Sequence, residues 1–255
     1  MNDDLGGRPV LISYCPLCRS GVVFNRIVDG RELDFGNTSA LFESDLVMLD
    51  RQTGSYWWQV AGEALVGTLT GTRLEPLPST MATWGEWLEA HPQTLVLSPP
   101  DGNIDRYLVD RFGTYEDFID GSNFGFPVGD QSRDPRLPAS ELVLGLERDG
   151  IHRVYPIESL QNAVVNDDVG GVPVVVFSTA GPAGAAFSRA VGEEVLTFQL
   201  LDDEFRDDQT GSTWNLAGKA TAGILSGTEL TALAGRTTFW FAYVGAFPEV
   251  EVWQP

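Results

Sequence analysis

The chain has 255 residues, 43% of them hydrophobic, so it can fold around a sizeable core. Its 36 acidic residues against 16 basic ones give a formal net charge of -20, which argues against nucleic acid or an anionic membrane as a partner. No apolar run reaches the ~18 residues of a membrane-spanning helix, so we expect no membrane insertion.

The first expected element is a hairpin from Pro9 to Arg26, which contains both cysteines of the chain. Apolar runs on either side of Cys15-Pro16-Leu17-Cys18 predict a strand, a tight turn and a second strand. The CxxC spacing lets two sulfurs meet each other or share one metal ion. No other part of the sequence places reactive side chains so close together.

Short strands and turns are expected from the end of this hairpin to residue 77. The segment 44–49 is apolar, and 50–55 is typical of a turn in which Gly54 can take a positive φ. Glycines then recur at 62, 67 and 71, a spacing that suits bends in a curved sheet or barrel.

The clearest helix follows these strands. Thr83 and Glu86 have capping-box spacing, and Pro92 ends the helical pattern. Trp84, Trp87 and Leu88 share one face, and a counterpart helix is expected to begin near Trp240.

The segment 99–140 is rich in glycine, proline and aspartate. An unstructured loop of this length is improbable in a compact protein, so we expect an ordered strap. The aromatic residues that would hold it in place are Tyr107, Phe112, Tyr115, Phe118, Phe124 and Phe126.

The remainder of the chain repeats its beginning. Asn2–Val10 returns as Asn166–Val174 with seven of nine positions identical, and 60–77 returns as 216–233 with nine of eighteen identical. Self-similarity of this kind indicates a duplication. Residues 141–165 precede the second copy and have no counterpart before Asn2, so we expect that the chain starts inside its first repeat or that a neighbouring molecule covers the gap as a homo-oligomer.

These elements predict an α+β fold, mainly β, with few short helices. It would consist of two homologous β-rich repeats related by pseudo-twofold symmetry, in barrel-like or curved sheets. Repeat 1 spans 2–98 and carries the CxxC, the strap spans 99–140, and repeat 2 spans 141–255 without cysteines.

The chain resembles the domain of unknown function 3179 family. The resemblance rests on the motifs Ser13–Cys18, Ser44–Met48, Thr53-Gly54-Ser55, Trp57-Trp58-Gln59, Thr83–Trp87, His91-Pro92, Asp134-x-Arg136-Leu137-Pro138 and Tyr155-Pro156. It implies a fold but no mechanism, because the family name carries no established activity. Members often have a His-Glu pair where this chain has Asn162-Ala163.

Four interpretations of Cys15 and Cys18 remain open. They could bind zinc with remote ligands, form a redox dithiol, or hold two-coordinate copper(I) with Met48 as a thioether ligand. They could also be two small buried residues or an incidental disulfide. The matching turn of the second copy, 175–187, has no cysteine, which favours a functional role.

The other function class is a non-catalytic binding module with an aromatic groove between the repeats. Trp57 and Trp58 are adjacent, so in a strand one of them should face outward and could line that groove. His91 is expected to cap a helix end, with a site role as the alternative. The small ligand of such a groove is unknown.

The start of the chain has neither the basic flank nor the apolar core of a signal peptide. We therefore expect a cytoplasmic location for the chain as it stands. Export would be expected if a longer N-terminus carries a signal.

The charge generates a prediction about salt. Acidic residues lie along the whole chain and Lys219 is the only lysine, a surface typical of a halophile. Raising the salt concentration to about 1 M shortens the screening length to ~3 Å and should raise the midpoint of thermal unfolding. A midpoint that stays constant or falls with salt would contradict the halophilic interpretation.

Overall fold

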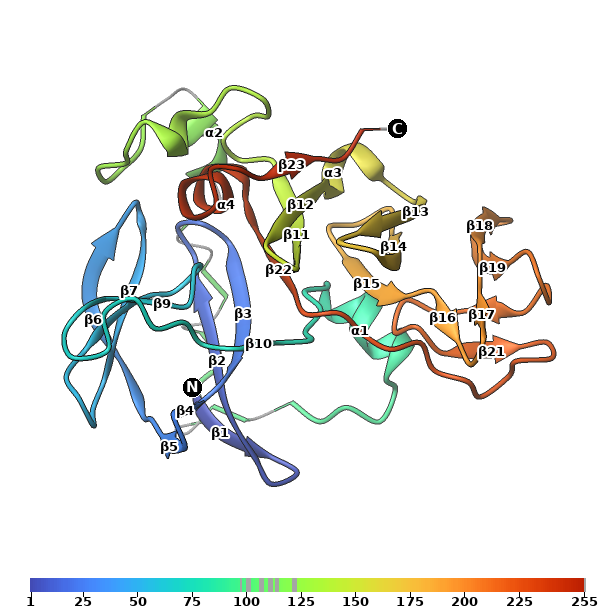
Figure 1. Ribbon diagram of the computed structural model, residues 1–255, viewed down its shortest axis with the longest axis horizontal. Helices are drawn as coiled ribbons and strands as arrows, with labels where there is room; N and C mark the ends of the chain where they lie inside the picture. The colour runs from blue at the N-terminus through green and yellow to red at the C-terminus, as the bar shows by residue number, and fades with distance from the viewer. Residues whose placement is uncertain are drawn as a thin grey trace.

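The computed structural model describes residues 1–96, 98–99, 102–105, 108–109, 112, 115–120 and 123–254. The protein is mainly β with few short helices, as predicted (Figure 1). The strands form several open sheets and ribbons, and none of those in the described residues closes into a barrel. The barrel-like form expected from the glycine spacing is therefore not found.

The largest sheet joins strands from both ends of the sequence. Neighbouring strands in this sheet are antiparallel, except for the last pair, which is parallel. A short additional strand, β10 (Pro76–Leu77), also pairs with β3. The order is β1 (Asn2–Leu5), β2 (Arg8–Cys15), β3 (Ser20–Asn25), β22 (Gly235–Phe239), β11 (Leu142–Arg148), β12 (Ile151–Pro156) and β23 (Glu251–Val252).

Smaller sheets flank this one. One four-stranded sheet follows the first hairpin: β6 (Phe35–Phe42), β7 (Asp45–Asp50), β8 (Tyr56–Trp58) and β9 (Glu63–Val66). A three-stranded sheet contains β13 (Val164–Val169), β14 (Val172–Ser178) and β15 (Gly184–Ser188). A second four-stranded sheet contains β18 (Phe198–Leu201), β19 (Glu204–Asp207), β20 (Thr213–Trp214) and β21 (Ala220–Ala222). Two ribbons complete the strands: β4 (Ile27–Val28) with β5 (Arg31–Glu32), and β16 (Ala190–Val191) with β17 (Glu194–Val195).

The helices are short. They are α1 (Trp84–Ala90), α2 (Tyr115–Asp120), α3 (Ile157–Leu160) and α4 (Trp240–Ala246), with the 3-10 turn η2 (Gln131–Arg133). The capping box predicted for α1 is present in full, and His91 is its C-terminal cap. No helix in the described part of the chain is long and apolar enough to cross a membrane.

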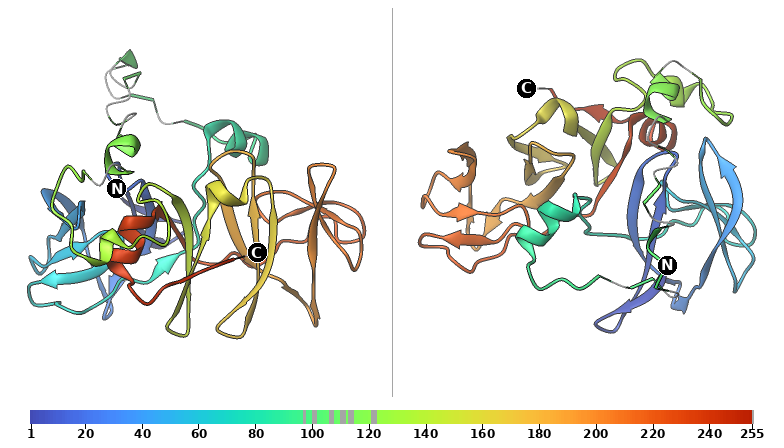
Figure 2. Two further views of the ribbon diagram at one scale, coloured as in Figure 1. Left: turned by 90° about the horizontal axis from the view of Figure 1, so that it is seen from above. Right: turned by 180° about the vertical axis from the view of Figure 1, so that it is seen from behind.

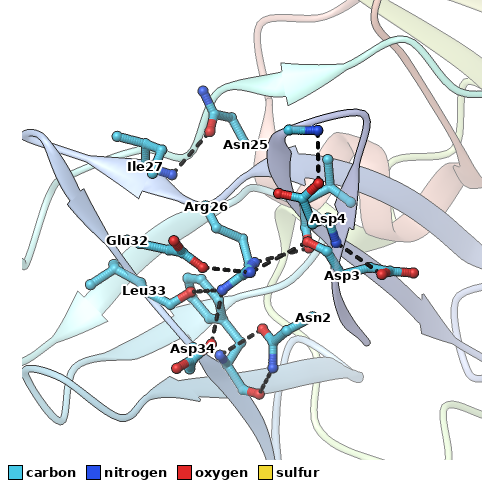
Figure 3. A network of polar contacts seen from close by, with 12 residues as sticks. Asn2, Asp3, Asp4, Asn25, Arg26, Ile27, Glu32, Leu33 and Asp34 are labelled. Atoms are coloured by element: carbon cyan, nitrogen blue, oxygen red, sulfur yellow. Dashed lines mark hydrogen bonds and ion pairs between the residues drawn. The ribbon is translucent and has the colours of Figure 1, made fainter.

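A buried arginine holds the start of the chain together (Figure 3). The guanidinium of Arg26 donates to the backbone oxygens of Val10 and Leu33, at 3.0 and 2.8 Å. It also forms ion pairs with Glu32 and Asp34, each at 2.8 Å. Because a buried charge is costly without such partners, Arg26 fixes the ribbon β4–β5 against the first hairpin.

The same turn chemistry occurs twice in the chain. Trp57 Nε1 donates to Asp50 Oδ2 at 2.9 Å, and Trp214 Nε1 donates to Asp207 Oδ2 at the same distance. Each aspartate also accepts a hydrogen bond from the backbone N–H three residues later, at 2.6 Å. A buried indole N–H therefore has its acceptor in both places.

The last part of each of the segments 2–98 and 141–255 pairs with a hairpin of the other segment. Thr237 lies opposite Gly21 of the first hairpin, whereas Met81 lies opposite Gly184 of β15. The helices that follow, α4 and α1, thus lie against hairpins that are distant in sequence. As a result, the far end of the chain covers the CxxC turn.

The middle segment covers the same turn from another side. Ile119 of α2 is fully buried beside the cysteines, and Tyr115 and Phe124 pack into the same cluster. Phe112, Phe118 and Phe126 are exposed. Tyr107 lies outside the described residues, so the strap as a whole stays a prediction.

Candidate metal centre

The hairpin β2–β3 places the two cysteines on its inner face. Side chains alternate along β2, so that Leu11, Ser13 and Cys15 point inward while Tyr14 is exposed. Cys15 ends β2 opposite Ser20, and the four residues between them form the turn that carries Cys18. Both cysteines are free thiols, 2% and 0% exposed.

A carboxylate from another sheet completes the cluster. Asp45 is the first residue of β7 and is fully buried. One of its oxygens and the sulfurs of Cys15 and Cys18 all lie within 4.8 Å of one another. The Cys18 thiol donates to Asp45 Oδ1 at 3.0 Å, and the Val60 N–H donates to Oδ2 at 2.8 Å. The second bond fixes how the carboxylate faces the sulfurs.

A buried polar chain supports Cys18 from the side of β3. Its sulfur lies 3.2 Å from Ser20 Oγ, and that hydroxyl in turn donates to Gln59 Oε1. The Gln59 amide donates to Ser13 Oγ at 2.9 Å. Since buried polar groups without partners are costly, this chain restricts Ser20 and the adjacent sulfur to one arrangement.

The far end of the sequence closes the site. The backbone N–H of Phe239 and the hydroxyl of Thr238 both donate to the Cys18 carbonyl oxygen, each at 2.8 Å. Phe241 and Ala242 of α4, together with Ile119 of α2, pack around the thiols. The cluster is therefore an interior site and not a surface turn.

Burial and mutual repulsion raise the pKa values of Asp45 and Cys18. Burial raises the pKa of Asp45 to about 6. It also raises the pKa of the Cys18 thiol well above its usual range, and the negative charges of Asp45 and Cys15 add to the effect. The pKa of Tyr115 is raised by burial and by the neighbouring thiols. A cation placed among these groups would reverse each shift.

Asp45 was not among the predicted site residues, whereas Met48 was. Met48 packs in a different part of the core, with Phe24 and Trp57, and the structure does not bring it to the cysteines. The available sequence signal was a single acidic residue at the start of the apolar segment 44–49. The sequence does not show that Asp45 faces the cysteines, because this contact forms between two different sheets.

The expectation that Trp57 or Trp58 faces outward is wrong. Trp57 packs in the cluster with Phe24, and Trp58 packs on the opposite face of β8 with Trp240, so both are buried. The sheet is covered on both faces, which strand alternation alone does not reveal. His91 lies at the end of α1 with its ring 4.3 Å from that of Trp87, and it belongs to no cluster with the cysteines.

The raised pKa of Asp45 generates a prediction for the metal-free protein. The folded state holds a proton that the unfolded state releases, so Asp45 adds stability below about pH 4 that is lost as the pH rises through about 6. A shift of about two pKa units corresponds to roughly 3 kcal/mol. Asp45→Asn should therefore unfold in urea with a weaker pH dependence between these values, in the presence of a chelator.

The matched control is Asp202→Asn, because Asp202 is exposed. It should keep the pH dependence of the wild type. If Asp45→Asn also keeps it, the buried carboxylate does not hold the extra proton.

Comparison with known protein families identifies a family for this chain. The family model described as protein of unknown function (DUF3179) matches residues 1–250. No curated protein and no solved structure matches the chain. Because the family model covers nearly the whole sequence, the chain belongs to the DUF3179 family.

Proposed function

We propose that the protein binds a thiophilic metal ion at Cys15, Cys18 and Asp45. The observation that carries this proposal is the convergence of three acidic donors, all buried, within 4.8 Å. In the absence of a cation they must all keep protons or repel each other at close range. A metal ion removes that cost by replacing the protons.

The donor set favours zinc over copper(I). Zinc takes thiolate sulfur and carboxylate oxygen together in tetrahedral sites, and three protein ligands leave one position for an outside ligand. Copper(I) prefers soft ligands and would need only the two sulfurs. The carboxylate of Asp45, held toward the thiols by the Val60 N–H, is the feature that distinguishes the two.

A thiol-redox role has less support. A reactive dithiol needs one accessible thiolate with a lowered pKa. Here both thiols are buried, and the pKa of Cys18 is raised. The aromatic-groove alternative loses its contact surface because Trp57 and Trp58 are both core residues.

We also propose that the chain consists of two copies of one β-rich unit, 2–98 and 141–255, related by a pseudo-twofold axis. The paired aspartate–tryptophan turns support this, as does the crossing of 79–83 and 235–239 onto each other's hairpins. The cysteines then lie in only one of two equivalent turns. The second turn contains Thr179, which donates to Glu86 of α1.

Metal content and affinity test the proposal. Protein purified without an affinity-tag metal should contain close to one zinc ion per chain, measured by mass spectrometry. After removal by chelation, Cys15→Ser and Cys18→Ser should bind added zinc at least about 100-fold more weakly, because each removes a ligand outright. Asp45→Asn should also weaken zinc binding, and Met48→Leu, the matched control, should not.

The variants also separate the alternatives. Copper bound in preference to zinc, with Asp45→Asn neutral, would assign a two-sulfur copper(I) site. The cysteines would be assigned a structural role by two results together: the wild-type protein binds neither metal, and the Cys15→Ser, Cys18→Ser double variant is several kcal/mol less stable than the wild type.

A further inference from the structure

Arg236 is a buried arginine that lacks acceptors. It lies in β22 opposite Gly145 of β11 and is 2% exposed. Its Nε and Nη1 atoms have no hydrogen-bond partner among the described residues. Glu147 Oε2 lies 3.6 Å from Nη1, which is too far for a hydrogen bond. Because unpaired buried donors are costly, this guanidinium needs an acceptor from outside the described part of the chain.

Arg26 shows how the same chain satisfies a buried arginine. Arg26 is 5% exposed, and its guanidinium has two backbone oxygens and two carboxylates within 3.0 Å. Arg236 is at least as buried, yet two of its three guanidinium nitrogens have no such contact with any residue that the structure describes. The contrast indicates a ligand site and not a general property of buried arginines in this fold.

Two more basic side chains lie close to Arg236, around the ring of Phe247. The guanidinium carbons of Arg236 and Arg73 are 5.1 and 5.9 Å from the centre of that ring. The imidazole of His152 stacks on it, with the ring centres 4.1 Å apart. Phe247 is the C-terminal cap of α4, which lies beside the hairpin β11–β12 in both views of Figure 2. Like charges gathered at one ring repel each other unless a negative charge separates them.

The fold itself does not require a cation at position 73. Arg73 forms an ion pair with Glu63, at 2.8 Å. The matching positions of the repeated sequence are Glu229 and Lys219, which also form an ion pair, at 3.1 Å. The two charges are therefore reversed between the pairs. Arg73 is thus a feature of this one site, where it adds positive charge beside a buried guanidinium.

The surroundings of Arg236 set the size and charge of the ligand. Both unpartnered nitrogens are shielded from solvent, so the ligand is small. The side chains of Arg73 and Glu147, which are 50% and 34% exposed, lie on the solvent side of the site. A water molecule has two acceptor sites and no charge, whereas Nε and Nη1 together carry three N–H groups of a cation. A monatomic anion accepts hydrogen bonds from any direction and also balances the charge.

We propose that Arg236, Arg73 and His152 hold a halide ion beside Phe247. Arg236 supplies the buried N–H donors, and Arg73 closes the site from its exposed side. The imidazole of His152 lies against the same ring and interacts with the ion through its charge. This site is independent of the cysteines and of any metal bound there.

His152 can report on the ion because charged and polar groups surround it. Its Nδ1 is 3.3 Å from the hydroxyl of Tyr243 on α4, and it lies opposite Glu147 in the β11–β12 register. Burial lowers the pKa of His152, and the Glu147 carboxylate raises it. The positive charges of Arg236 and Arg73 lower this pKa further. A halide bound between the guanidiniums and the imidazole favours the protonated ring, so it should raise the pKa.

The chain has only two histidines, which makes proton NMR a direct test. Chloride replaces gluconate at constant ionic strength, so that screening does not change. The pKa of His152 should rise with chloride and level off about one unit higher. The pKa of His91, at the end of α1, should stay constant, and a His91→Gln variant assigns the two signals. A His152 pKa that is the same in chloride and gluconate would overturn the proposal.

Variants locate the ion. Arg73→Gln should raise the chloride concentration of half effect about tenfold, because it removes one charged donor. The matched control is Arg206→Gln, since Arg206 is also exposed and paired with a glutamate, and it should change nothing. Arg236→Met should abolish the chloride dependence. If that variant fails to fold, Arg73→Gln decides, and a chloride dependence equal to that of the wild type overturns the proposal.

Discussion

The structure depends on the insertion of β22 between the first hairpin and β11. This strand meets β3 at Thr237 and Gly21 and pairs with β11 along its length. Its last residues donate two hydrogen bonds to the Cys18 carbonyl oxygen. One strand near the end of the chain thus joins the largest sheet, anchors the CxxC turn and positions α4 over the thiols.

This insertion gives the candidate site its electrostatic character. A CxxC turn at the tip of an exposed hairpin would be hydrated, and its thiols would titrate near their ordinary values. Covered by α4 and α2, the thiols and Asp45 share an apolar interior with little solvent to separate their charges. The same burial disfavours a reactive thiolate, and it therefore supports the proposal of metal binding over that of redox chemistry.

Features set by neighbouring residues were predictable from the sequence. The hairpin around the cysteines follows from strand alternation, and α1 follows from the capping box of Thr83 and Glu86. Features set by distant contacts were not. Asp45 becomes part of the site only because β7 meets the hairpin turn, and Trp58 is buried only because α4 covers its sheet. The thioether sulfur of Met48 was expected to be a third metal ligand, but Met48 packs in a different core cluster from the thiols.

The most direct test of the account is X-ray absorption spectroscopy of the metal-loaded wild-type protein at the zinc edge. The account predicts two sulfur neighbours at about 2.3 Å and oxygen or nitrogen neighbours at about 2.0–2.2 Å. In the Asp45→Asn variant the sulfur shell should persist while the oxygen shell changes. A first shell of oxygen and nitrogen alone, without sulfur, would contradict the assignment of Cys15 and Cys18 as ligands.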